Sequence, residues 1–280
     1  GVVGQRHGEG ELLVGVRGGV GDDGLGDLEV ARLAGVGERG QLGGGIDRAG
    51  VALLGGGHVL HGILGHGIAD ALRQAQELGY AEADPSADID GDDIRRKLTI
   101  SANIAFGALL NEETIPMFGI RTVTDGDIAT FQSAGYVCKL IATARKTEGG
   151  VAAWLEPTLM DSHALEAAVP ANYNLITLIG SASGRMSFYG QGAGRYPTAY
   201  NVMQDCADVL AGKGFYSPYG GKVAAENDGE LSFYVRGAAW PEEVAETWGD
   251  AVITKPVAVS KIHAWRKENP DAFIAAMPAK

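Results

Sequence analysis

The sequence is poor in basic residues: 23 lysines and arginines stand against 35 aspartates and glutamates, which gives a formal net charge of −12. Binding to nucleic acid or to an anionic membrane surface needs clustered basic side chains. The sequence also lacks an apolar run near the roughly 18 residues that span a bilayer. No compact apolar stretch follows a basic start, as it would in a signal peptide. We therefore expect a cytoplasmic protein with no nucleic-acid partner and no membrane partner.

Cysteine is almost absent, since Cys138 and Cys206 are the only two. Each lies in a largely apolar run, "YVCKL" and "MQDCADVL". Free cysteine behaves as a small hydrophobic residue, and disulfides are rare in cytosolic proteins. We expect both to be buried free thiols.

Residues 1–67 lack ten amino-acid types, among them every aromatic residue, lysine, serine, threonine and proline, and they hold 23 of the 43 glycines. Glycine at this density raises the entropy cost of folding, and no aromatic side chain is present to build a core. The missing types are nearly all encoded by codons that begin with A or T. We interpret the segment as mis-translated, read in a wrong frame or on the opposite strand, and we expect it to be poorly ordered and to form no Rossmann domain.

Two glycine motifs in this segment, "GVGDDG" (19–24) and "GVGERG" (35–40), match the dinucleotide-binding pattern G-x-G-x-x-G. Such matches are expected by chance at this glycine content, and neither follows a convincing apolar strand. His58, His61 and His66 lie close together, but they lack the glutamate of H-E-x-x-H and any cysteine partner. We expect no metal site here.

From residue 68 onward the sequence has the patterning of an ordinary globular domain. Apolar spacing and capping residues predict helices over 68–78, 92–110, 124–135 and 198–212, and strands over 136–144, 150–159, 172–180 and 230–237. Helices interleaved with strands indicate an α/β (α+β) fold, a mixed sheet with helices packed on it. The end of the chain, "ENPDAFIAAMPAK", predicts a short helix-like tail. We set the domains at 1–67, 68–240 and 241–280.

The stretch "GYAEADPSADIDGDDIRRKL" (79–98) concentrates six carboxylates before Arg95, Arg96 and Lys97. One interpretation is a solvated loop followed by a helix start. The other is a polar site for a small charged substrate. Asp93 and Lys97 are four residues apart, so a helix places them on one face. By residue type alone, an ordinary exposed ion pair explains them better than a site.

The motifs around this stretch resemble homoserine dehydrogenases. The segment "ALRQAQELGYAEADPSADIDGDDIRRKLTISANIAFG" is similar to the substrate-binding segment of that family, with Gly-Tyr-x-Glu-x-Asp-Pro and a later Asp-x-x-x-Lys. "GIRTVTDGDI", "LEPTLM" and "YGQGAGRYPTA" follow in the family's order. The resemblance covers about residues 68–240. The family's Rossmann domain, its Asn-Gly-Thr motif and a C-terminal regulatory module are not recognisable.

The resemblance implies hydride transfer between a nicotinamide cofactor, NADPH or alternatively NAD, and a small-molecule substrate, in the interconversion of L-aspartate 4-semialdehyde and L-homoserine. It assigns substrate binding to Glu82 and Asp88, proton donation to Lys97, and a catalytic position beside it to Asp93. It places Gly192, Ala193 and Gly194 beside the cofactor, although a glycine-rich turn with Thr198 as the cap of the next helix explains that stretch without the family.

The resemblance also implies a homodimer. The alternative is a truncated, non-catalytic remnant that only binds a ligand or a partner subunit.

Overall fold

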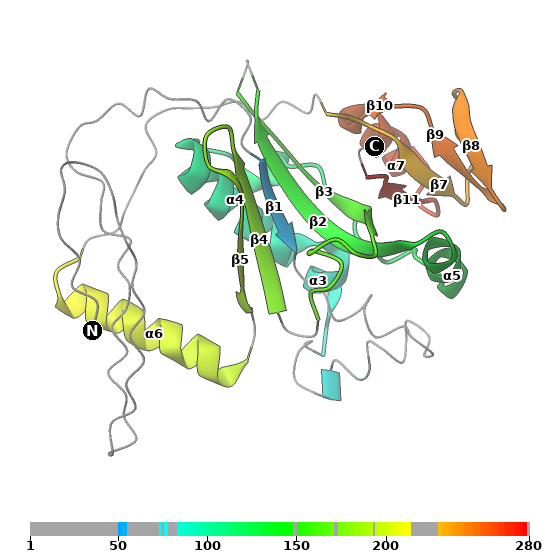
Figure 1. The fold of residues 1–280 in the computed structure, drawn as a ribbon. Helices are drawn as coiled ribbons and strands as arrows, with labels where there is room; N and C mark the ends of the chain where they lie inside the picture. The colour runs from blue at the N-terminus through cyan, green and yellow to red at the C-terminus, as the bar shows by residue number, and fades with distance from the viewer. Residues whose placement is uncertain are drawn as a thin grey trace. The chain divides into compact units, whose positions relative to one another are not determined.

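The computed structural model describes residues 50–54, 73, 76–77, 83–147, 150–170, 173–192, 194–213 and 229–278. Within this part of the chain a nine-stranded sheet has the order β5-β4-β1-β2-β3-β11-β7-β9-β8 (Figure 1). Neighbouring strands are antiparallel except β3 and β11, which are parallel. The sheet is therefore mixed, and the predicted fold class is confirmed. Its strands are β1 (Gly50–Leu54), β2 (Tyr136–Lys146), β3 (Val151–Asp161), β4 (Tyr173–Gly180), β5 (Gly184–Gln191), β7 (Phe233–Arg236), β8 (Val244–Trp248), β9 (Ala251–Thr254) and β11 (Phe273–Ala276).

The long hairpin of β2 and β3 forms the centre of the sheet, with Tyr136 opposite Asp161 and Lys146 opposite Val151. Most residues of both strands are buried. On β11, Phe273 and Ala275 join one apolar cluster while Ile274 and Ala276 join another. Because successive side chains of a strand point to opposite faces, the sheet has a core on each face.

Helices cover both of these faces. Helix α4 (Asp92–Phe106) packs on β1 and β2 and buries Ile94, Leu98 and Ala102 at helical spacing. It ends earlier than predicted because Gly107 adopts a left-handed conformation with φ 59°. Helix α5 (Asp125–Ser133) packs on β2 and begins with a capping box between Thr124 and Asp127. Helix α7 (Val259–Glu268) contributes Val259 and Ile262 to the core of the other face.

One strand comes from the segment that the sequence predicts to be poorly ordered. Residues 50–54, "GVALL", form β1 and pair antiparallel with β2 on one side and β4 on the other. The prediction is wrong for these five residues, because a short apolar run can complete a sheet whose neighbours supply both ladders. The two glycine motifs and His58, His61 and His66 lie outside the described residues.

The C-terminal residues also differ from the prediction of a helix-like tail. The segment "FIAA" is the strand β11, fully buried between β3 and β7. A short apolar run has no periodicity of its own, so its neighbours decide its conformation. The order β11-β7-β9-β8, with α7 before β11, matches the 4-1-3-2 order of a β-α-β-β-α-β unit without its first helix. The residues set apart as 241–280 thus contribute strands to the sheet. A separate pair, β6 (Glu230–Leu231) and β10 (Val257–Ala258), lies beside this unit.

The two cysteines have different environments. Cys138 on β2 is buried, and burial raises the pKa of its thiol to about 12. Cys206 is exposed, because helix α6 (Arg195–Leu210) buries none of its residues. The prediction of a buried thiol is therefore wrong for Cys206.

Strand β4 is half-buried, since buried and accessible residues alternate along it. No helix in the described part of the chain is long and apolar enough to cross a bilayer.

Candidate functional site

The acidic stretch folds as two consecutive helices, α3 (Ser86–Asp90) and α4, with the single residue Gly91 between them. Gly91 has φ 99°, which side-chain-bearing residues rarely adopt. A Cβ atom at this position would lie 2.3 Å from Cδ2 of Leu155 on β3. The turn thus lies directly against the sheet, and only glycine fits there. Asp88 on α3 and Asp93 and Lys97 on α4 lie on either side of this turn.

Residues 119–121 hold α3 in place. The amide of Ile120 donates to the carbonyl oxygen of Ile89 at 2.9 Å. Gly119 lies so close that a Cβ atom would come within 2.2 Å of the same oxygen. Arg121 donates two hydrogen bonds to Asp90, at 2.8 and 2.6 Å, and a longer one to Ser86. The segment "GIRT" therefore acts as a clamp on the helix that carries Asp88.

Asp93 and Lys97 form an ion pair, with 2.7 Å between Oδ2 of Asp93 and Nζ of Lys97. Both side chains are 43% exposed, so the ammonium group is held by one carboxylate and is still open to a ligand. The structure thus brings together the two residues to which the resemblance assigns catalysis. Asp88 is half-buried on α3. Glu82 lies outside the described residues.

The same face of α4 continues with apolar side chains that the sequence reading missed. Ile100 and Ile104 follow Asp93 and Lys97 at spacings of three and four residues and are 58% and 53% exposed. Residues at these spacings are neighbours on a helix surface. The charged pair therefore lies at the end of an uncovered apolar stripe. The sequence "KLTISANI" could have revealed these exposed apolar residues, because Ile100 and Ile104 do not fall on the buried face of the helix.

The glycine turn at 190–194 leads from β5 into α6. Gly194 is the N-cap of α6, and no side chain caps the helix, so the prediction of Thr198 as the cap is wrong. Gly194 has φ 125°, and a Cβ atom on Gly192 would overlap the amide group of Asn174. Close packing and backbone conformation thus require both glycines locally. Ala193 lies outside the described residues.

Two buried polar clusters and one buried lysine lie beyond the acidic stretch. Asp127 accepts hydrogen bonds from Tyr234 at 2.7 Å and from Arg236 at 2.6 Å. Burial raises the pKa of Asp127, but the hydrogen bonds from Arg236, Thr124 and Tyr234 outweigh it and hold the pKa below its ordinary value. Lys139 on β2 is buried and donates to the carbonyl of Val169 at 3.1 Å. Burial lowers its pKa to about 8.

The second cluster is the pair of Glu156 on β3 and His263 on α7, both buried. It joins residues 107 positions apart, and no local pattern marks the partner of Glu156. In the described residues, no group of three or more His, Cys, Asp or Glu side chains is arranged to hold a metal ion.

Comparison with known proteins supports the resemblance. A family model for homoserine dehydrogenase matches residues 58–207, which is 150 of the 280 residues. The match begins ten residues before the start at 68 that we set from the sequence, and it ends before 240. The homoserine dehydrogenase of Pseudomonas aeruginosa is 43% identical over 141 residues, which cover 50% of this chain and 32% of the relative. That of Bacillus subtilis is 38% identical over 141 residues, covering 50% and 33%.

Solved structures agree with the sequence comparison. The structure of a homoserine dehydrogenase from Thiobacillus denitrificans matches with a TM-score of 0.69 at 25% identity, covering 84% of this chain and 64% of that one. The Staphylococcus aureus enzyme at pH 7.5 matches with a TM-score of 0.64 at 26% identity, covering 84% and 66%. The chain spans about a third of the length of the curated relatives that it matches. Because the family model matches more than half of the chain, this protein belongs to the homoserine dehydrogenase family.

Proposed function

We propose that this chain supplies the substrate-binding and proton-transfer part of a homoserine dehydrogenase, which interconverts L-aspartate 4-semialdehyde and L-homoserine on the route to threonine, methionine and isoleucine. The observation that carries the proposal is the Asp93–Lys97 pair, 2.7 Å apart on one face of α4. The family match includes this motif. We place the protein in the cytoplasm, in keeping with a biosynthetic enzyme.

Lys97 fits the role of proton donor. Reduction of an aldehyde places negative charge on its oxygen, and a nearby ammonium group can stabilise that charge and protonate it. Asp93 holds the ammonium group in one orientation through its ion pair. The side chain of Lys97 remains accessible, so a substrate can reach it.

The acidic residues before Lys97 fit the other end of the substrate. Both substrate and product carry an α-ammonium group, which forms charge-assisted hydrogen bonds with carboxylates. We assign this contact to Glu82 and Asp88. The clamp of Arg121 on Asp90 fixes the helix on which Asp88 lies.

The glycine turn fits one side of a nicotinamide cofactor, which would supply or accept the hydride when bound. Gly192, Ala193 and Gly194 would line it, and the N–H groups at the start of α6, which no side chain caps, suit an anionic group. We propose NADPH, with NAD as the alternative. Among the described strands, the only parallel neighbours are β3 and β11, and several strands and helices lie between them in the chain, so they do not form the strand–helix–strand unit of a dinucleotide-binding domain.

We further propose a homodimer through β5 and α6. Strand β5 is the edge of the sheet, and all of its residues are exposed. Phe188 and Tyr189 on β5 and Tyr196 and Met203 on α6 are among the exposed apolar side chains. Exposed apolar side chains in this number mark a contact site, and a two-fold axis would let the same residues of two copies face each other. Sedimentation should show a dimer that Phe188→Glu dissociates, whereas a monomeric wild-type chain would contradict the proposal.

The experiment that tests the activity measures NADPH oxidation by this chain with aspartate 4-semialdehyde, together with calorimetric titration of L-homoserine and of NADPH. Turnover supports the proposed activity. The second candidate is a non-catalytic remnant that binds only a ligand or a partner subunit. Binding of L-homoserine without turnover would identify that remnant, and binding of neither ligand would contradict both functions.

A further inference from the structure

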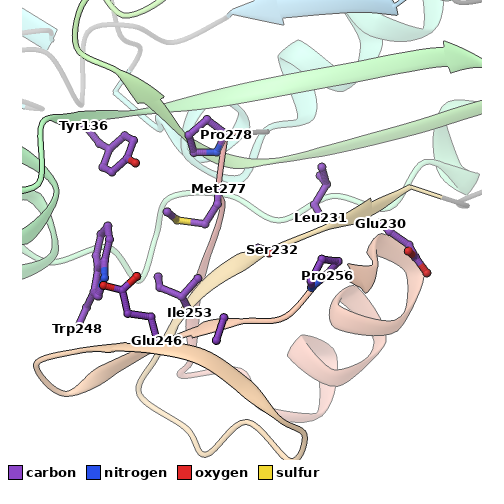
Figure 2. A pocket seen from close by; sticks show the side chains of 11 residues that line it. Tyr136, Glu230, Leu231, Ser232, Glu246, Trp248, Ile253, Pro256, Met277 and Pro278 are labelled. Carbon is purple, nitrogen blue, oxygen red and sulfur yellow. The ribbon is translucent and has the colours of Figure 1, made fainter. Parts of the chain in front are cut away.

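A pocket of about 450 Å³ lies in the C-terminal part of the fold. It is lined by residues from the start of β2, from β6, β8 and β9, and from the segment after β11 (Figure 2). Its volume is in the range of small-molecule sites. None of its lining residues belongs to the acidic stretch, to α4 or to the glycine turn. The pocket is therefore a candidate site separate from the proposed dehydrogenase chemistry.

The inner part of the pocket is apolar and aromatic. Trp248, Ile253 and Met277 contribute to it, and Figure 2 shows their side chains grouped together. Tyr136 stacks on Trp248, with 6.0 Å between ring centroids and 26° between planes. Tyr234 meets Trp248 edge-on. These contacts fix the orientation of the indole, so the apolar surface is preformed.

The charge of the pocket has one sign. Glu230 and Glu246 line it, and no lysine, arginine or histidine is among the described residues that do. Figure 2 shows Glu246 beside Trp248 and Ile253, with Glu230 apart from them. Within the described part of the chain, neither carboxylate takes part in an ion pair, while two nearby glutamates do. Glu243 pairs with Lys255 at 2.8 Å, and Glu242 pairs with Lys261.

We propose that this pocket binds a small organic cation with an apolar body, such as an aryl- or alkylammonium compound. The apolar part would contact Trp248, Ile253 and Met277, and an ammonium group would interact with the carboxylate of Glu246 and with the electron-rich aromatic rings. Two carboxylates without a basic residue repel anions. The site therefore discriminates against phosphates and carboxylates, which excludes a nucleotide as its ligand.

The test uses three probes that share an aromatic body and differ in charge: 2-phenylethylammonium, 2-phenylethanol and 3-phenylpropionate. Affinities are measured by calorimetry on the full chain, and the location is read from the indole N–H signals of the four tryptophans. The signal of Trp248 is assigned by its loss in Trp248→Phe. We expect the cation to bind most tightly and to shift the Trp248 signal, while Trp154, Trp240 and Trp265 keep theirs.

Glu246→Gln should weaken binding of the cation by about threefold to tenfold, the range that accessible charge pairs give. Glu230→Gln should have a smaller effect, because Glu230 lies apart from Glu246 and Trp248 (Figure 2). Both residues are exposed, so the variants should fold normally. Glu243→Gln, which removes an equally charged residue outside the pocket, is the matched control and should leave the affinity unchanged. Equal binding of cation and anion, no binding of the cation, or unchanged affinity in Glu246→Gln would overturn the proposal.

Discussion

Nε2 of His263 lies 2.7 Å from Oε2 of Glu156, and both side chains are almost completely buried between α7 and β3. Burial raises the pKa of Glu156 above its ordinary value, and the contact with His263 partly opposes that rise. The other oxygen, Oε1 of Glu156, is buried without a hydrogen-bond partner among the described residues. His263 is therefore the main contact that offsets the burial of this carboxyl group, and it joins α7 to the sheet.

Replacement of His263 by alanine should reduce the free energy of unfolding by about 3–5 kcal/mol, because removing one partner of a buried pair leaves the other uncompensated. His163, which is exposed, is the matched control, and His163→Ala should change stability by less than about 0.5 kcal/mol. Urea denaturation of both variants measures the difference. Equal effects would contradict the structural role of the buried pair.

The same variant should change the pH dependence of stability. A carboxyl group whose pKa is raised in the folded state favours folding at low pH, and this contribution is lost as the pH rises from the ordinary value of 4.5 through the folded pKa. Without His263 the pKa of Glu156 rises further, so His263→Ala should lose stability over a wider pH range than the wild type. Denaturation across pH 4–8 measures the two profiles, and parallel curves would argue against this linkage.

The local parts of this fold could be predicted from sequence, because their signals lie within a few residues. The helix predicted over 124–135 is capped by Thr124, which forms a capping box with Asp127, and Gly135 has a left-handed backbone, with φ 82°, just beyond its end. The β2–β3 hairpin follows from two apolar runs around a polar turn. The spacing of Asp93 and Lys97 likewise predicts the contact that the structure shows.

The parts that depend on distant partners could not be predicted in this way. "FIAA" becomes a strand because β3 and β7 lie on either side of it. Cys206 is in an apolar run, yet it is exposed on α6, which buries none of its residues in the described part of the chain. The clamp of Arg121 on Asp90 links positions 31 residues apart, so its partner is invisible in a local pattern. The resemblance identifies the catalytic motif, but it does not predict the contact between Arg121 and Asp90.

Substitution of Gly91 by alanine should destabilise the turn between α3 and α4 strongly. Both the positive φ of 99° and the 2.3 Å approach of a Cβ atom to Leu155 oppose a side chain. Gly135 separates the two causes, since it has φ 82° but nothing within 4 Å of a Cβ atom. Gly135→Ala should cost about 1–2 kcal/mol from backbone strain alone, and Gly91→Ala should cost clearly more. Thermal unfolding of the two variants tests this, and similar costs would mean that Leu155 moves aside freely.

Substitution of Arg121 by glutamine should loosen α3. The helix has no buried residue of its own, so the bidentate contact to Asp90 is a main restraint. Hydrogen exchange of the amides in residues 86–90 should become faster by about fivefold, the factor that roughly 1 kcal/mol gives. Arg96→Gln is the control, because Arg96 is similarly exposed (57% against 58%) but lies 3.9 Å from its partner Glu112. Unchanged exchange in Arg121→Gln would show that Ile120 and Gly119 hold the helix without it.

Lys97→Ala should lower turnover of aspartate 4-semialdehyde by about 10²–10⁴-fold, the usual contribution of a general acid. The helix should stay intact, because alanine is the best helix former. Arg96→Ala removes the same charge from the neighbouring position, outside the Asp93–Lys97 pair, and should keep near-normal turnover.

The assay uses this chain or, if it has no turnover alone, a fusion to the remaining N-terminal part of the Bacillus subtilis relative. Asp93→Asn should fall between the two, because it leaves the ammonium group present but no longer held by a charge. If Lys97→Ala and Arg96→Ala have equal turnover, the Asp93–Lys97 contact is only a surface ion pair on a solvated helix.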